Sequence, residues 1–101
     1  MSFDYKLHSE AVTEYADAYK WYELQQKGLG EKFIAAIDRH VIQICNNPEY
    51  YSKTGKYYRQ VAVDGFPFVI VYQYFPQKAF VHITAIHHYR KHPRKKYRKQ
   101  E

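Results

Sequence analysis

The stretch from Gly65 to Pro93, GFPFVIVYQYFPQKAFVHITAIHHYRKHP, decides the fold. Within it, residues 68–73 and 80–86 each alternate between two sets of side chains, and β-branched and aromatic residues dominate both segments. Such alternation is typical of strands that pack one face against a core. The segment FPQK at 75–78 separates the two at a proline, which cannot donate a backbone hydrogen bond to a sheet. The sequence therefore predicts a β-hairpin that the rest of the chain must cover or extend.

Two helices are predicted before this hairpin. The first begins after Ser9, an expected N-cap, and ends near Gly28. Its apolar positions recur at helical spacing: Val12, Tyr15, Ala16, Tyr19 and Tyr22. Gly30 is expected to separate it from a second helix, which the Asn46-Asn47-Pro48 sequence ends. The short connection predicts an antiparallel helical hairpin.

Two further strands are predicted on either side of the helices. Residues 3–8 alternate apolar and polar side chains and suit a short first strand. Residues 48–56 are expected to form a loop, and residues 57–63 a strand that turns at Asp64-Gly65 into the hairpin. The predicted order is β-α-α-β-β-β, an α+β fold in which the helical hairpin covers one face of a small antiparallel sheet. The first strand is expected at an edge of that sheet.

Length and charge predict a single domain with a basic end. The chain has 101 residues and a net charge of +6. Residues 1–86 hold nine basic and nine acidic side chains, so the whole net charge lies in residues 87–101. We expect one domain over residues 1–93 and a basic tail over residues 94–101. A basic end of this kind favours a polyanionic partner, either nucleic acid or an acidic protein segment.

The cysteine count and hydropathy exclude several classes of protein. Cys45 is the single cysteine, so the chain forms no internal disulfide and offers no cysteine cluster for a metal. It contains no apolar run long enough to span a membrane and no recognisable leader. We expect a soluble, cytoplasmic protein with no membrane partner, no metal and no cofactor.

Several motifs, taken in order, resemble the RelE/ParE superfamily, the toxins of bacterial type II toxin–antitoxin (plasmid stabilization) systems. They are the helical hairpin ending at Asn47-Pro48, Arg59 at the start of a strand, the segment Gly65–Tyr72 (GFPFVIVY), and the strand 81–86 that leads into histidine and basic residues. The resemblance covers nearly the whole chain. It implies the RelE/ParE-like fold and a cognate antitoxin that neutralises the protein by covering its basic groups.

The end of the chain departs from the family pattern, in which many members have His-x-x-Arg-x-Pro followed by an aromatic residue. His87 and Arg90 keep the His-x-x-Arg spacing, but the proline comes one position late. Starting from His88 restores the position of Pro93 but places Lys91 where arginine is expected. The sequence leaves open which histidine corresponds to that of the family.

The ribonuclease branch of the superfamily implies ribosome-dependent, metal-independent cleavage of messenger RNA. Histidine can move the protons of that reaction, and arginine or lysine can hold the charge that develops on phosphorus. The candidate catalytic residues are Arg59, His87, His88, Arg90 and Tyr97. The candidate RNA- or target-binding residues are Lys53, Lys56, Lys91, Arg94, Lys95 and Lys96.

Two other functions stay open on the same residues. One is a ParE-like inhibitor of DNA gyrase, which binds its target and needs no acid or base. The other is an inactive relative whose basic groove only binds a partner. Simpler roles also remain: Arg59 could tie a sheet edge to a helix carboxylate, and the tail could be solvated. Because neighbouring strand residues point to opposite faces, at most one of His87 and His88 is expected to face a site.

Overall fold

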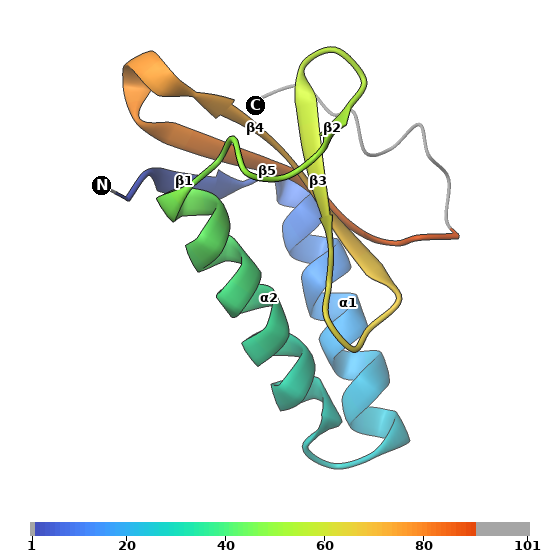
Figure 1. The fold of residues 1–101 in the computed structure, drawn as a ribbon. Helices are drawn as coiled ribbons and strands as arrows, with labels where there is room; N and C mark the ends of the chain where they lie inside the picture. The colour runs from blue at the N-terminus through green and yellow to red at the C-terminus, as the bar shows by residue number, and fades with distance from the viewer. Residues whose placement is uncertain (1, 91–101) are drawn as a thin grey trace.

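The computed structural model describes residues 2–90. Within them, two antiparallel helices lie on one side of a five-stranded sheet (Figure 1). The helices are α1 (Ser9–Gln25) and α2 (Leu29–Asn46). The strands are β1 (Asp4–Leu7), β2 (Lys53–Thr54), β3 (Tyr58–Ala62), β4 (Phe68–Phe75) and β5 (Phe80–His88), with a 3₁₀ turn at Pro76–Lys78.

The strand order across the sheet is β1-β5-β4-β3-β2. β3, β4 and β5 form the predicted antiparallel meander, and β1 occupies an edge, where it runs parallel to β5. The α+β class and the RelE/ParE-like arrangement are therefore confirmed. One strand was missed: within the predicted loop 48–56, β2 pairs Lys53 with Arg59 and Thr54 with Tyr58. A two-residue strand leaves too short a pattern to be recognised from sequence.

The connection between the helices differs from the prediction at both glycines. α1 already ends at Gln25, and Gly28 is the N-cap of α2, with a positive φ of 89°. Gly30 lies inside α2 rather than between the helices. The reason is Glu23, whose Oε1 accepts hydrogen bonds from the amides of Gly28 and Gly30, each at 2.9 Å. One carboxylate of α1 thus satisfies two amides at the start of α2 that have no partner within the helix.

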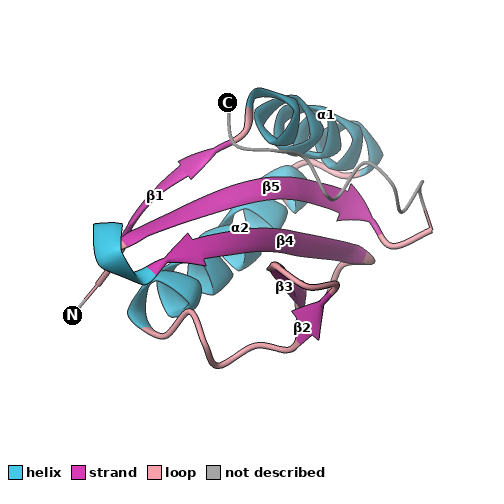
Figure 2. Ribbon diagram, turned by 90° about the horizontal axis from the view of Figure 1, so that it is seen from above, coloured by secondary structure: helices cyan, strands magenta, loops and turns pink. Residues whose placement is uncertain are grey.

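The start of α1 is also capped differently. His8, not Ser9, is the N-cap, because its Nδ1 accepts the amide of Glu10 at 3.1 Å. The backbone amide of His8 donates to the carbonyl of Ile83 at 2.9 Å. The first turn of α1 is therefore tied directly to β5. As Figure 2 shows, α1 then continues alongside β5, beyond the point where β1 ends.

The core lies between the helices and the sheet and is strongly aromatic. Phe33 of α2 is fully buried, and its ring lies 5.1–5.4 Å from the rings of Tyr22, Phe66 and Phe68. Tyr72 is also fully buried and donates its hydroxyl to the carbonyl of Pro48 at 2.6 Å. Tyrosine and phenylalanine rings thus build the core, and the Tyr72 hydroxyl also fixes the loop after α2.

The predicted alternation of β5 is interrupted by a bulge. Val71 pairs with Ala85 and Tyr72 pairs with Ile83, so Thr84 is an extra residue in β5. Because of this extra residue, Ile86 joins Val81 and Ile83 in the core, although strict alternation predicts the opposite face for it. The Thr84 hydroxyl donates to the carbonyl of Val71 at 3.2 Å.

Tyr15 gives a pH-dependent prediction for stability. Burial, and then the charge and hydrogen bond of Asp38, raise the pKa of Tyr15 to about 12. The folded state therefore holds this proton more tightly than the unfolded chain, in which tyrosine has a pKa near 10. We expect the Tyr15 contribution to be complete below pH ~10 and to be lost as the pH rises towards ~12.

The measurement is urea unfolding of the native protein and of Tyr15→Phe between pH 8 and 11. The native protein should lose more stability than the variant over this interval. The exposed Tyr50→Phe serves as the matched control. Equal slopes for the native protein and Tyr15→Phe would contradict the prediction.

Candidate functional site

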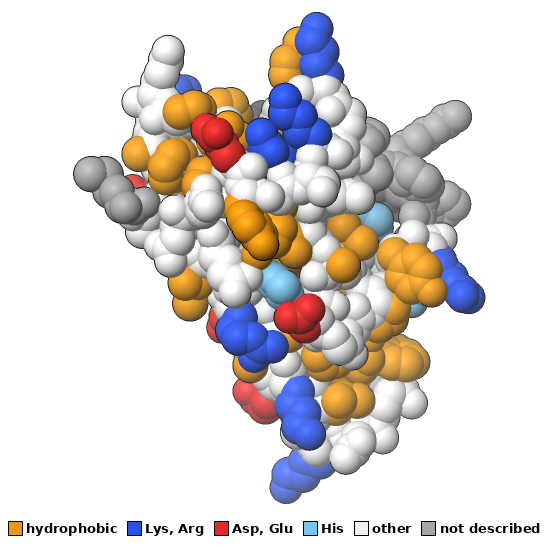
Figure 3. All heavy atoms as spheres, viewed as in Figure 1, with side chains coloured by type: hydrophobic (Ala, Val, Ile, Leu, Met, Phe, Trp, Pro, Cys, Tyr) orange, Lys and Arg blue, Asp and Glu red, His pale blue; other side chains and the backbone are white. Residues whose placement is uncertain are grey.

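The structure brings two of the predicted binding residues and one predicted catalytic residue together at the β2–β3 end of the sheet. Lys53 and Arg59 are cross-strand partners, and Lys56 lies in the turn between these strands. With Tyr57, Tyr58, Tyr74 and Pro76 they line a hollow of about 260 Å³. Figure 3 shows the basic side chains gathering at this end, at the top of the view. We call these residues the basic–tyrosine surface.

Arg59 is fixed by the loop that follows α2. Its Nη1 donates to the carbonyls of Glu49 at 3.1 Å and Tyr51 at 2.7 Å. Its guanidinium carbon lies 5.6 Å from the centre of the Tyr74 ring, within cation–π range. Instead of the helix carboxylate suggested from the sequence, Arg59 thus binds two backbone carbonyls. Arg59 therefore has a structural role beside any role in binding.

Tyr74 adds a polar group to the same surface. Burial is the largest cause that raises its pKa, followed by a hydrogen bond with Glu49, while Arg59 acts in the opposite direction. Tyr74 consequently keeps its proton at neutral pH and donates it in a hydrogen bond to the Glu49 carboxylate. The surface thus combines cations with a phenolic donor and aromatic rings, which suits a partner that carries anionic groups and flat rings.

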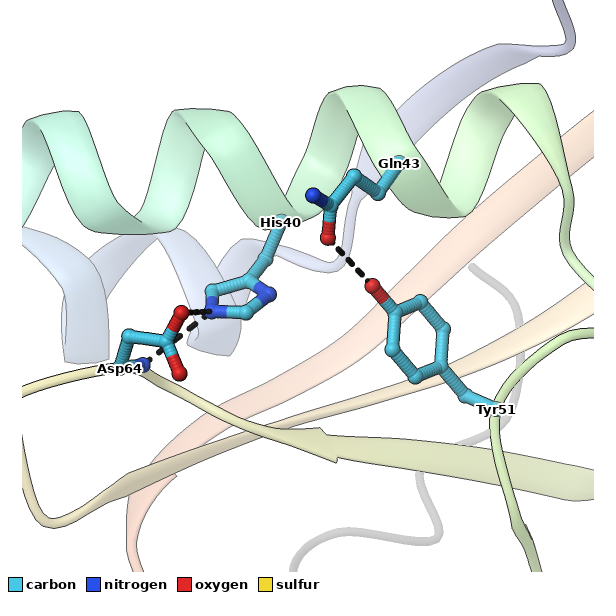
Figure 4. Close-up of polar contacts among 4 residues, drawn as sticks. All are labelled: His40, Gln43, Tyr51 and Asp64. Carbon is cyan, nitrogen blue, oxygen red and sulfur yellow. Dashed lines mark hydrogen bonds and ion pairs between the residues drawn. The ribbon is translucent and has the colours of Figure 1, made fainter.

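Two contacts of α2 hold the loop that precedes β2 and the connection that follows β3 (Figure 4). The Tyr51 hydroxyl donates to Gln43 Oε1 at 2.5 Å, which positions the loop whose carbonyls bind Arg59. The amide of Asp64 donates to Nε2 of His40 at 3.1 Å, which fixes the β3–β4 connection. His40 is nearly buried. Its Nδ1 has no hydrogen-bond partner among the described residues, so the ring is held in the core by its Nε2 contact alone.

The contacts of His87 and His88 assign each ring a tautomer. Nδ1 of His87 lies 2.9 Å from the His88 carbonyl, which can only accept, so Nδ1 carries the proton and Nε2 is an acceptor. Nδ1 of His88 accepts the amide of Arg90 at 3.2 Å, so Nε2 of His88 is the donor. His87 is 8% exposed, whereas His88 is half-buried. The two neighbouring histidines thus present opposite hydrogen-bonding groups.

The histidines lie far from the basic–tyrosine surface. Arg59 of β3 pairs with Tyr72 of β4. His88 of β5 pairs with Phe68, which lies four residues before Tyr72 on β4. In a regular sheet this offset separates the Cα atoms of Arg59 and His88 by roughly 15 Å. His88 packs edge-on against Phe68, with ring centres 5.6 Å apart. His87 pairs with Val69, so its side chain leaves the strand on the opposite side.

Of the remaining candidates, the structure describes only Arg90. Arg90 is exposed, and its guanidinium lies over the ring of Tyr89, with Nε donating to the Tyr89 hydroxyl at 3.1 Å. The other predicted residues lie outside the described range: Lys91, Arg94, Lys95, Lys96 and Tyr97.

A second hollow, not predicted from the sequence, lies between α1 and the end of β5. Its volume is about 460 Å³. One wall is formed by Glu14, Asp17 and Trp21 of α1, and the other includes Phe68 and His87. Positions 14, 17 and 21 share one face of a helix. This spacing is visible in the sequence, but the neighbouring stripe of tyrosines gives the stronger helical pattern. Trp21, the chain's single tryptophan, is 57% exposed.

Neither a metal-ligand cluster nor a membrane-spanning helix occurs in the part of the chain that the structure describes. Among residues 2–90, no three histidine, cysteine, aspartate or glutamate side chains lie together as a metal site requires. No helix in that range is long and apolar enough to cross a membrane.

Comparisons with known proteins give one family and several related folds. The family described as the ParE toxin of the type II toxin–antitoxin system parDE matches residues 5–93. A chain of the chromosomal ParDE system from P. aeruginosa is 14% identical, with a TM-score of 0.73 over 86% of this chain and 96% of that one. An arginine-to-alanine double mutant of the E. coli toxin RelE in the free state is 13% identical, with a TM-score of 0.61 over 85% of this chain and 82% of that one. No curated protein sequence matches significantly.

Proposed function

The chain belongs to the family of ParE toxins of type II toxin–antitoxin systems, and on that premise we propose that it arrests growth by binding DNA gyrase rather than by cutting messenger RNA. Membership of the family implies a cognate antitoxin. The RelE/ParE fold alone does not distinguish the two modes of action. The choice between them rests on how the candidate catalytic residues are placed.

The separation of Arg59 from the histidines carries this proposal. Cleavage of RNA requires a proton-transferring group and a charge-holding group within hydrogen-bond reach of one phosphate. The Cα atoms of His88 and Arg59 are roughly 15 Å apart by sheet spacing, and the Arg59 guanidinium is held by the Glu49 and Tyr51 carbonyls. Both features disfavour joint action of the two side chains on one phosphate. His87 is further removed because it leaves β5 on the other side. An inhibitor that acts by contact has no such requirement.

We infer that the basic–tyrosine surface makes the contact with the target. Tyr57 is 67% exposed, and the ammonium group of Lys56 lies 5.4 Å from the centre of its ring. Tyr50 is exposed on the loop that binds Arg59. Exposed aromatic and basic side chains on a rigid strand edge are the groups that dominate binding energy at protein interfaces. An acidic antitoxin segment that covered this surface would neutralise the toxin, and action on gyrase would take place in the cytoplasm.

A gyrase supercoiling assay with purified protein tests the proposal. We expect inhibition by the native protein, a loss of at least about tenfold for Arg59→Ala, and largely retained inhibition for the His87→Ala/His88→Ala double variant. Arg39→Ala, which removes an exposed arginine from α2, is the matched control. Circular dichroism of each variant separates loss of contact from loss of folding, because Arg59 also holds the loop.

Cleavage of messenger RNA is the second candidate, favoured by the chemistry of the same surface. Lysine and arginine can bind phosphate, and tyrosine can stack on an unpaired base. The deciding experiment is a map of messenger RNA 5′ ends in a reconstituted translation reaction. New ends at codon spacing that require both ribosomes and the native histidines would overturn the gyrase proposal. Absence of new ends, with gyrase inhibited, would support it.

A further inference from the structure

The face of the sheet that points away from the helices is buried at its centre. Tyr72 and Ile83 pair with each other, and both belong to the core on the helix side. Their neighbours Val71 and His82 therefore point to the opposite face. Two more residues of β5 lie there, because they pair with Val71 and Val69 in the register. We call the following set the far face: Val71, His82 and Ala85, each 0% exposed, and His87, 8% exposed.

The described helices and strands do not account for this burial. Both helices lie on the other side of the sheet, and all five strands belong to the sheet itself (Figure 1). The connections between strands leave from the strand ends. A sheet that is covered on one side normally leaves its second face to solvent. Side chains without exposed surface at the centre of that face therefore require a further segment above them.

His87 supplies a second, independent observation on the far face. Its Nε2 has no hydrogen-bond partner among the described residues, although the side chain is buried. Nδ1 lies 2.9 Å from the His88 carbonyl and carries the proton, so Nε2 is an acceptor. A buried acceptor without a donor is unfavourable. The segment that covers the far face is therefore expected to bring a donor to His87.

We propose that the far face is the docking site of the chain's own C-terminal segment, residues 91–101. The chain turns at residues 89–90, directly after β5, where the Tyr89 amide donates to the Pro67 carbonyl at 3.0 Å. The eleven residues that follow can span about 36 Å in extended form. His82, at the other end of the far face, lies roughly 20 Å back along β5 from His88. The segment is thus long enough to cross the whole face.

The composition of the segment suits these surroundings. Six of its residues are cationic: Lys91, Arg94, Lys95, Lys96, Arg98 and Lys99. The side of α1 beside β5 is acidic, since Glu14 Oε1 accepts the Ile86 amide at 3.1 Å and two further carboxylates, Glu10 and Asp17, lie about one turn before and after it. The cations can pair with these carboxylates and donate to the acceptor on the far face. An acidic segment of a partner protein would be repelled by the same carboxylates.

This assignment does not depend on whether the toxin acts on gyrase or on messenger RNA, because it rests on the burial of the far face. A nitroxide label on the segment tests it in the full chain. Gln100→Cys carries the label in a Cys45→Ala background, which leaves one thiol. We expect the label to broaden the methyl resonances of Val71 and Ala85. The methyl resonances of Ile42, which is 60% exposed on α2, should stay sharp.

Two controls decide whether the occupant belongs to the same chain. With the label at Lys27→Cys, in the connection between the helices, Val71 and Ala85 should stay sharp. They should also stay sharp in a mixture of isotope-labelled chains and separate nitroxide-labelled chains. Broadening in the mixture would assign the far face to a second copy. That result, or sharp Val71 and Ala85 resonances with the label at residue 100, would overturn the proposal.

A charge reversal tests the pairing with α1. Lys95→Glu/Lys96→Glu in the nitroxide-labelled chain should remove most of the broadening on the far face. It should also shift the Nε2 resonance of His87, whose donor would be lost. Lys27→Glu/Lys32→Glu makes the same change of charge on exposed residues near the connection between the helices, and should leave both signals unchanged. Equal signals in the two double variants would overturn the proposal.

Discussion

Replacing Phe33 with alanine is expected to lower the free energy of unfolding by about 3–5 kcal/mol, the range typical of a buried phenylalanine. Phe33 is fully buried, and the rings of Tyr22, Phe66 and Phe68 surround it at 5.1–5.4 Å. These rings come from α1, the β3–β4 connection and β4. They cannot all move into the vacated space, so both transfer free energy and packing contacts would be lost.

Denaturant unfolding followed by circular dichroism measures this effect. Ile42→Ala, at a site on the same helix that is 60% exposed, is the control and should change stability by less than ~1 kcal/mol. Phe33→Leu should fall between the two, because it keeps much of the side-chain volume. A loss of less than ~1 kcal/mol for Phe33→Ala would mean that the aromatic cluster is not the centre of the core.

Gly30→Ala is expected to destabilise the protein by about 1–3 kcal/mol, the cost of overpacking, although alanine is the better helix former. In an exposed helix the same change is stabilising by roughly 1 kcal/mol. Here a Cβ atom at Gly30 would lie 2.8 Å from the carbonyl oxygen of Tyr19 and 2.6 Å from Cγ of Glu23. The carbonyl belongs to the backbone of α1, so the two helices would have to separate.

The thermal midpoint tests the sign of this effect. Glu23→Ala/Gly30→Ala should not restore stability, because the Tyr19 carbonyl remains and two hydrogen bonds to Glu23 are lost. Ala35→Gly, at an exposed site on α2, shows the ordinary propensity effect and should cost about 1 kcal/mol. A midpoint raised by Gly30→Ala would show that the helices lie further apart than described.

The fold could be predicted from sequence because its periodic segments are long. β4, β5 and both helices each carry enough alternating or helical positions to identify them. The errors arise where a distant side chain decides the local structure. Glu23 sets the helix connection through Gly28 and Gly30, His8 replaces Ser9 as the cap, and the Thr84 bulge moves Ile86 to the core face. None of these contacts leaves a periodic signal.

The candidate site was predicted less well, because residue type indicates chemistry but not distance. Lys53, Lys56 and Arg59 are close in sequence, and they do share one surface. His87 and His88 joined the same list only through the family resemblance, and the sheet places them far from Arg59. Asp17 and Trp21 were overlooked because a hollow between α1 and β5 depends on contacts between segments about 65 residues apart, which no local pattern indicates.

The pairing of the first strand with the last determines when during synthesis the protein can become harmful. β1 is made first, but its partner in the sheet is β5, which also pairs with β4 and ends at His88. A nascent or prematurely terminated chain that stops before Phe80 lacks the strand on which both neighbours depend. Such fragments cannot complete the sheet, so we expect termination before Phe80 to yield an inert product. A cell that makes this toxin therefore encounters its activity only after the chain has been synthesised as far as β5.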